Sequence, residues 1–140
     1  MEQIAVSPGL TLTVQKTVGD TDTSKHYGSG TLGDVFATPS LVALMIEASA
    51  RLVDENLGEN FISVGKMSKV VHEQPTMLGE NVSVKVTVKE SDRYRVSLEM
   101  EAYDEIGLVG TGMHERFIVA KDSFFQKAGE RAGRLENRDF

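Results

Sequence analysis

Residues 38–53 are the only long helical candidate among the first 120 residues, and this stretch constrains the fold of the whole chain. Thr38 can cap the N-terminus of a helix, because its hydroxyl can accept a hydrogen bond from a free backbone N–H. Pro39 suits the first helical position, where no backbone N–H is needed. Apolar side chains cover most of the circumference of the predicted helix, which is typical of a buried helix. At about 1.5 Å per residue, a helix from Pro39 to about Asn56 is roughly 25–27 Å long.

The rest of the chain is predicted to be mainly strand, so strands must enclose this helix. Five stretches have the residue pattern of strands, namely residues 9–19, 61–73, 82–88, 94–102 and 108–120. Short turns between the last four favour an antiparallel meander. One antiparallel sheet wrapped around one long central helix is an α+β architecture, and we expect this fold.

Turn signals set the expected ends of these elements. Gly58 is expected to stop the helix in a left-handed conformation. Residues 124–134 are a candidate for a short amphipathic helix, and residues 131–140 are polar and expected to fray. We therefore expect residues 1–140 to form a single domain with a core from about residue 9 to 128.

Composition narrows the class of protein. The chain has no cysteine, which excludes disulfides, cysteine-ligated zinc and thiol nucleophiles. Its net charge of −6 argues against non-specific binding to nucleic acid. No stretch has the pattern of a signal peptide or a membrane span, so we expect a cytoplasmic protein without a nucleic-acid or membrane partner.

A second copy of the chain is the expected partner. One sheet covers only part of an apolar helix and leaves its own edge strands unpaired. A second copy is the simplest cover for both, so we expect a homodimer, with a tetramer left open.

The stretch from residue 19 to 33 is small, polar and rich in glycine, which predicts a loop. A loop of this length in a compact domain is either a lid or binding loop, or a mobile connector.

The histidines are the main candidates for chemistry, since no phosphate-binding loop or zinc-protease motif is present. They are His26 in the loop, His72 at the end of a predicted strand and His114 in the last predicted strand. Taken alone, each is more often an ordinary half-exposed residue than a catalyst. No spacing supports metal binding by the three together, so we expect no metal and no cofactor.

Three short blocks at matching spacing carry a resemblance to a known family. They are Val35–Pro39 with Ala43–Met45 and Glu47–Ala48, then Gly65 seven residues before His72 with Pro75 and Gly79, and finally Gly110–Arg116. Together these blocks resemble the hot-dog-fold acyl-CoA thioesterases, and most closely the fluoroacetyl-CoA thioesterase group. The likeness covers about residues 10–128, and it implies a sheet wrapped around a helix in a dimer.

The resemblance implies a thioester hydrolase with a threonine at the helix start, a glutamate on the helix and a histidine on the following strand. Thr38 and His72 match the first and third of these. The glutamate position is Ile46 here, and the neighbouring carboxylate is Glu47. One residue rotates a helical side chain by about 100°, so Glu47 faces a different wall unless the helix start is adjusted. Asp34, just before the helix, is an alternative carboxylate, and Glu47 alternatively faces the dimer seam or pairs with a basic residue.

Further site positions follow from the same resemblance. Gly65 would let the substrate approach the strand backbone, or it marks a β-bulge. His72 would activate water or protonate the departing thiolate, and Thr38 would orient His72, bind the carbonyl or only cap the helix. Arg116 would contact the pantetheine or phosphates of CoA, or form a surface ion pair. Leu32 stands where the family has a lid residue that selects the fluoroacyl group, and because it is not aromatic, fluoroacetate is not inferred.

Three functions remain open on this basis. The first is hydrolysis of a short or medium acyl-CoA to free acid and CoA. The second is a non-catalytic acyl-CoA-binding module of the same fold, favoured by Ile46 in place of the glutamate. The third and weakest is an acyl-CoA hydratase, which needs an aspartate and a histidine close together on one loop, where Asp20, Asp22 and His26 give a faint match.

Overall fold

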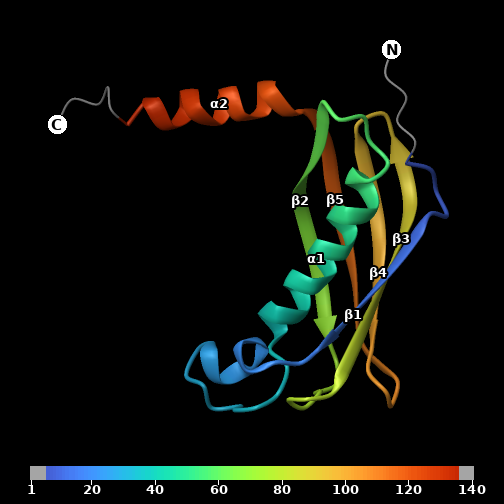
Figure 1. Ribbon diagram of the computed structural model, residues 1–140, viewed down its shortest axis with the longest axis vertical. Helices are drawn as coiled ribbons and strands as arrows, with labels where there is room; N and C mark the ends of the chain where they lie inside the picture. The colour runs from blue at the N-terminus through green and yellow to red at the C-terminus, as the bar shows by residue number, and fades with distance from the viewer. Residues whose placement is uncertain (1–5, 136–140) are drawn as a thin grey trace.

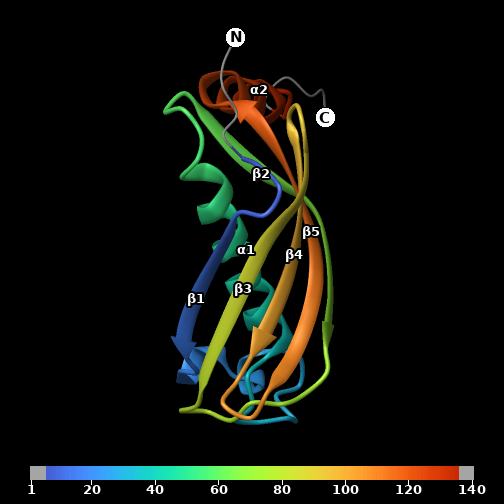
Figure 2. The ribbon, with the colours of Figure 1, turned by 90° about the vertical axis from the view of Figure 1, so that its right-hand side faces the viewer.

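The computed structural model describes residues 6–135, which form one antiparallel sheet, two α-helices and two short 3₁₀ turns. The strands are β1 (Thr11–Thr17), β2 (Phe61–His72), β3 (Asn81–Asp92), β4 (Arg95–Tyr103) and β5 (Leu108–Ala120). The helices are α1 (Thr38–Asp54) and α2 (Lys121–Gly133), and the 3₁₀ turns are η1 (Asp20–Asp22) and η2 (Ser24–His26). The sheet is curved and α1 lies against one of its faces (Figure 1, Figure 2). The expected α+β architecture is confirmed.

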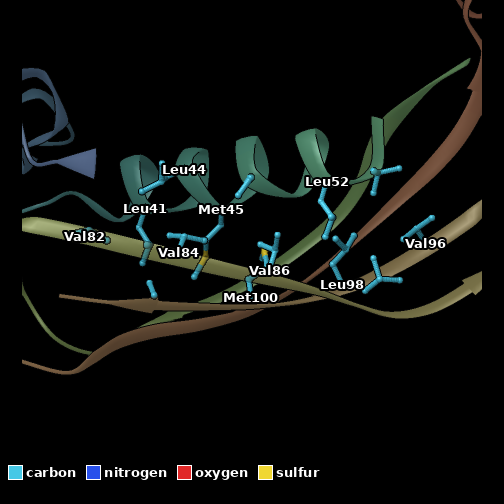
Figure 3. Close-up of a cluster of buried hydrophobic side chains, with 14 of the residues drawn as sticks. Leu41, Leu44, Met45, Leu52, Val82, Val84, Val86, Val96, Leu98 and Met100 are labelled. Atoms are coloured by element: carbon cyan, nitrogen blue, oxygen red, sulfur yellow. The ribbon is translucent and has the colours of Figure 1, made fainter. Parts of the chain in front are cut away.

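The core lies between α1 and the face of the sheet that points toward it (Figure 3). Alternate residues of β3 and β4 face α1, which is why the period-two pattern of the sequence marks these strands. The side chains that are almost fully buried here include Leu41, Met45 and Ala48 of α1, Val82, Val84, Val86 and Val88 of β3, and Leu98 and Met100 of β4. Burial of these apolar side chains is the main stabilising contribution to the fold.

The order of the strands differs from a simple meander. The order is β1-β3-β4-β5-β2, and every neighbouring pair is antiparallel. The strands β3, β4 and β5 form the predicted meander, but β2 pairs with β5 instead of β3. The meander prediction is wrong for β2 because β1 occupies the edge of β3 that β2 would need. Residues 73–80 connect β2 at one edge of the sheet to β3 near the other.

The two predicted caps of α1 are also wrong. Ala37 takes the N-cap position, and Thr38 is the first helical residue with its hydroxyl bonded elsewhere. At the other end, the Asn56 side-chain amide donates to a carbonyl of the last turn (2.8 Å). This bond satisfies a free carbonyl of the helix end, and Gly58 is not among the glycines with a positive φ.

The loop between β1 and α1 is ordered by backbone hydrogen bonds between its two arms. The N–H groups of Ser24 and Lys25 donate to the carbonyls of Val35 (2.8 Å) and Gly33 (3.0 Å). The turns η1 and η2 satisfy further backbone groups within the first arm. These bonds make the loop an ordered part of the fold, and the alternative of a mobile connector is not supported.

The helix α2 leaves the sheet at the end of β5 and runs across the strand direction (Figure 1). Its first residue is tied to the start of β2, because the Lys121 N–H donates to the carbonyl of Asn60 (2.9 Å). The predicted C-terminal helix is confirmed but begins earlier, and fraying is wrong for residues 131–133, which are helical. The remaining tail prediction, residues 136–140, lies outside the described residues. Neither helix within residues 6–135 is long and apolar enough to cross a membrane.

Candidate active site

Thr38 and His72 meet where the start of α1 approaches the end of β2. The Thr38 hydroxyl and Nδ1 of His72 share a hydrogen bond of 2.7 Å. The hydroxyl is available for this bond because Ala37 holds the N-cap position. The fold thus joins two residues that are 34 positions apart in the sequence. A hydroxyl bonded to an imidazole is an arrangement that can move a proton.

An open hollow of about 230 Å³ lies beside this pair. Its walls come from the loop before α1, from the start of α1 and from the end of β2. The lining residues are Ser24, Leu32, Val35, Phe36, Thr38, His72, Glu73, Gln74 and Pro75. The loop therefore forms one wall of the hollow, and the lining contains no lysine or arginine.

Three of the predicted site residues share this hollow, and others were missed by sequence reasoning. Leu32, Thr38 and His72 are brought together as the resemblance implies. Ser24 and Glu73 had no signal of their own, since neither belongs to a quoted block. Glu73 follows His72 directly, and that adjacency is the one feature that could have flagged it.

Burial holds His72 in its neutral form. Desolvation at this position lowers the pKa of the imidazole below its ordinary value. Its Nε2 atom is buried and has no hydrogen-bond partner among residues 6–135. The imidazole and the Phe36 ring pack at a steep angle, edge to face, with 6.4 Å between ring centroids. A neutral imidazole whose Nδ1 contacts an exposed hydroxyl is suited to accept a proton, not to donate one as imidazolium.

Neither of the predicted carboxylates reaches this pair within one protomer. Glu47 is exposed, and nine residues on an α-helix separate it from Thr38 by about 180° of rotation and about 13–14 Å along the axis. The Asp34 carboxylate lies 3.7 Å from Nζ of Lys25 and is not part of the lining. Ile46, at the family's glutamate position, is half-buried.

Arg116 is buried beneath β2 and separate from the lining of the hollow, with only 6% of its surface exposed. Its guanidinium donates to the hydroxyl and the carbonyl of Ser63, both at 2.7 Å. Its Nη1 also lies 3.2 Å from Nε2 of His114. The alternative of a surface ion pair is therefore wrong. The guanidinium N–H groups in these bonds point to buried acceptors and not to the surface, where a CoA phosphate would lie.

His114 is held by the same cluster. Its Nδ1 lies 2.9 Å from the carbonyl of Met67 and 2.7 Å from the hydroxyl of Ser68. Burial lowers the pKa of His114, and the positive charge of Arg116 lowers it further. The imidazole therefore stays neutral and accepts from Arg116 at Nε2.

Gly65 lies directly over this cluster and interrupts the regular pairing of β2. The register of β2 on β5 shifts between Gly65 and Met67, so the predicted bulge is confirmed. A Cβ on Gly65 would lie 3.3 Å from Nη1 of Arg116 and 3.3 Å from Cε1 of His114. Gly65 is also exposed, so its missing side chain leaves backbone open above buried polar groups.

The loop residues of the hydratase hypothesis form a surface cluster. Nε2 of His26 lies 3.2 Å from the Asp20 carboxylate, which also pairs with Lys25 at 2.6 Å. Asp22 accepts from the N–H of Gly19 (2.8 Å). None of these residues lines the hollow beside Thr38 and His72.

A larger hollow of about 370 Å³ lies elsewhere, on the face of the sheet that points away from α1. It is lined by Lys69, Val71, Glu99, Met100, Glu101, Thr111, Gly112 and Met113. This lining contains no histidine or hydroxyl–imidazole pair, so we place the chemistry at the smaller hollow.

Comparison with known proteins identifies the family. Residues 18–122 match the model of the family described as fluoroacetyl-CoA-specific thioesterase. The fluoroacetyl-CoA thioesterase of Streptantibioticus cattleyicolor is 30% identical over 98 residues, which are 70% of this chain and 70% of that protein.

Solved structures show the same fold. A hot-dog-like protein from Thermanaerovibrio acidaminovorans superposes with a TM-score of 0.83 at 32% identity, covering 89% of this chain and 91% of that one. The fluoroacetyl-CoA thioesterase structure gives a TM-score of 0.80 at 26% identity over 88% and 95% of the two chains. A variant of that enzyme has been solved in complex with acetyl-CoA. From this match over most of its length, the chain belongs to the fluoroacetyl-CoA-specific thioesterase family and has the hot-dog fold.

Proposed function

We propose that this protein hydrolyses a short or medium acyl-CoA thioester to the free acid and CoA. The observation that carries the proposal is the 2.7 Å hydrogen bond between Thr38 and a neutral His72 beside an open hollow, in a member of a thioesterase family. The complex of a related thioesterase with acetyl-CoA supports the choice of acyl-CoA as the substrate class.

In the proposed reaction, a water molecule beside Thr38 attacks the carbonyl carbon of the thioester. Its proton passes to Nδ1 of His72 through the Thr38 hydroxyl, and the C–S bond breaks to release CoA as a thiolate. The N-terminal end of α1 stabilises the negative charge that develops on the carbonyl oxygen. His72 acts as the base in this scheme because burial keeps it neutral.

Gly65 lies seven residues from His72 along β2, so Gly65 and Arg116 are proposed to meet the acyl end of a substrate bound at Thr38 and His72 of the partner subunit. The bare backbone at Gly65 allows close approach, and Nη1 of Arg116 lies directly below it. A polar substituent on a small acyl group would find a donor there, whereas a long alkyl chain would desolvate the cluster without compensation. The exposed Leu32 then covers the mouth of the hollow without the aromatic lid residue of the family.

A carboxylate that takes part in the reaction could come from one of three residues. Glu47 reaches the site only if it comes from a second protomer, because within one protomer it lies on another face of α1. Asp34 would first have to leave Lys25. To find which carboxylate takes part, kcat is compared among the variants Glu47→Gln, Asp34→Asn and Glu73→Gln. Glu73 is included because it already lines the hollow.

We also propose a homodimer that forms along β2. This strand is an edge of the sheet, and Met67 and Val71 on it are exposed. On α1, the apolar residues Val42, Ile46 and Ala50 remain half-buried. A second copy paired along β2 would cover both surfaces.

A panel of acyl-CoA thioesters with a thiol-trapping reagent tests the proposed function. We expect release of CoA above the uncatalysed rate for at least one short or medium acyl group. His72→Ala should lower kcat by about 10²–10⁴-fold because it removes the proton acceptor. An unchanged rate in this variant would remove His72 from the mechanism.

Thr38 offers a matched pair of variants for the same assay. Thr38→Val keeps the shape but removes the hydroxyl that contacts Nδ1, and we expect a fall in kcat of about 10²-fold. Thr38→Ser keeps the hydroxyl and should retain most of the activity. Equal rates in the two variants would mean that the hydroxyl has no part in the reaction.

The second candidate function is a binding module for acyl-CoA. The specific observation that favours it is Ile46 in place of the helix glutamate, with no other carboxylate bonded to Thr38 or His72 among residues 6–135. Tight binding of an acyl-CoA by calorimetry, without hydrolysis across the panel, would decide in its favour.

A further inference from the structure

The helix α2 has an apolar stripe that its own protomer does not cover. None of its residues is buried, and Phe125 is 57% exposed. At about 100° per residue, one side of the helix carries Phe124, Phe125, Ala128 and Ala132, and Leu135 follows just after the helix end. An isolated amphipathic helix of this length is marginally stable in water unless its apolar side packs against something.

A cationic flank borders this stripe. Lys127, Arg131 and Arg134 fall on one side of it, Asp122 falls on the other, and Glu130 lies on the opposite face of the helix. The three cations form no ion pair with another residue of the described range 6–135. The helix therefore presents apolar contact area and unpaired positive charge side by side.

The proposed substrate needs cations that the site of one protomer does not supply. CoA carries several phosphate charges, and this chain has a net charge of −6. The lining of the hollow contains no lysine or arginine. Lys25, in the neighbouring loop, is paired with Asp20 (2.6 Å), and the guanidinium of Arg116 is engaged by Ser63 and His114.

Two-fold pairing along β2 would bring α2 to the partner's site. In an antiparallel pair of identical strands, the Phe61 end of one β2 lies beside the His72 end of the other. The helix α2 starts at the Phe61 end, where Lys121 bonds to Asn60. It projects on the side of the sheet that carries α1, as the two ribbon views show (Figure 1, Figure 2). Strand pairing keeps the two sheets continuous, so the partner's Thr38 and His72 lie on that same side.

We propose that α2 of one protomer packs against the second copy and supplies Arg131 and Arg134 to the phosphates of the CoA bound in the partner's site. This inference rests on the proposed function and on the dimer along β2. The apolar stripe holds the helix on the partner, and the cationic flank faces the nucleotide end of the substrate. Each site of the dimer is then incomplete without the other protomer's helix.

The kinetic test uses the double variant Arg131→Glu/Arg134→Glu on the full chain. Loss of charge-assisted hydrogen bonds should raise KM for the acyl-CoA by about tenfold or more, with kcat little changed. The same acyl group on N-acetylcysteamine has no phosphates, and its KM should not change. Glu130→Gln, on the face of α2 opposite the apolar stripe, is the matched control and should leave both substrates unaffected. An equal KM for acyl-CoA in the double variant and wild type would overturn the proposal.

A heterodimer test decides whether the helix acts on the partner's site. Chains carrying His72→Ala are co-expressed with chains carrying Arg131→Glu/Arg134→Glu, and heterodimers are purified through two different tags. The proposal expects one working site per heterodimer, with the wild-type KM and about half the wild-type kcat, because the intact His72 meets the intact helix of the other chain. A KM that stays raised would show that the helix serves its own protomer and would overturn the proposal.

Binding measurements separate this inference from the proposed function. If wild type hydrolyses no thioester in the panel, the hydrolase proposal fails, and calorimetric binding of CoA to wild type and the double variant still tests α2. A tenfold weaker Kd in the double variant supports the helix as a phosphate-binding element, and equal affinities overturn it. A basic amphipathic helix can instead bind anionic lipid. Binding to phosphatidylglycerol vesicles through Arg131 and Arg134, with unchanged CoA affinity, would assign α2 to a membrane surface and overturn the proposal.

Discussion

Gly65 is a single position where packing and substrate access can be separated. An alanine Cβ there would lie 3.3 Å from both Arg116 and His114, so these neighbours must move by a few tenths of an ångström. We expect Gly65→Ala to cost about 1 kcal/mol of stability and to lower kcat/KM by about tenfold, because the methyl group displaces the Arg116 guanidinium that is proposed to meet the acyl group. Gly58→Ala is the control, since its nearest atom would be 4.0 Å away. Urea unfolding and steady-state kinetics measure the two effects, and an unaltered kcat/KM would remove Gly65 from the acyl site.

The sequence could identify residues by type and spacing but not by environment. Thr38 and His72 were placed together by the resemblance, and the structure bonds them. Arg116 was expected to contact CoA or to form a surface ion pair, and its burial was not foreseen, because an arginine is rarely buried without partners. Its burial depends on Ser63 from β2 and on His114, and neither contact is visible before β2 and β5 are known to pair. Ser24 was missed because only the fold of the loop brings it to the hollow.

The connection between α1 and β2 depends on one carboxylate at the end of the helix. Asp54 accepts hydrogen bonds from the N–H (2.9 Å) and the hydroxyl (2.6 Å) of Ser63, which also accepts from Arg116. Asp54→Ala would leave these donors without an acceptor, and we expect a loss of about 1–3 kcal/mol in the free energy of unfolding. The adjacent Glu55→Ala is the control, because its only ion pair is exposed at 3.8 Å from Arg51. Equal urea midpoints for the two variants would show that the Asp54–Ser63 contact does not stabilise the junction.

Among the helices and strands, the residue patterns predicted the elements themselves better than they predicted which strands pair. The helix α1 and the strands β3, β4 and β5 appear close to their expected bounds, because their periodicity reflects which side faces the core. The predicted position of β2 was wrong because β1 pairs with β3 along the edge that β2 would need. The caps were wrong for a related reason: the Thr38 hydroxyl has a tertiary partner, His72, that competes with the backbone.

Over the whole molecule, ionisable groups are distributed unevenly between interior and surface. His114 and Arg116 are buried and His72 is half-buried, whereas the acidic residues that give the chain its net charge of −6 lie mainly at the surface. The interior along β2 and β5 therefore contains the polar groups that a substrate would meet. The lining of the hollow supplies no cation for an anionic nucleotide, which is the physical reason for proposing that role for α2.

Global stability should depend on pH through His114, which is buried, and His72, which is half-buried. Burial lowers the pKa of both His72 and His114 in the folded state, whereas in the unfolded chain each titrates near its ordinary value of about 6.5. The unfolded chain therefore binds protons first as the pH falls. The free energy of unfolding keeps its full value above about pH 6.5 and decreases progressively below it. We expect the free energy of unfolding from urea titrations to fall between about pH 7 and pH 5. His114→Gln removes one of the two groups, so it should reduce the slope of stability against pH over this range even if it lowers stability at every pH. A slope equal to that of wild type would show that His114 does not titrate differently on folding.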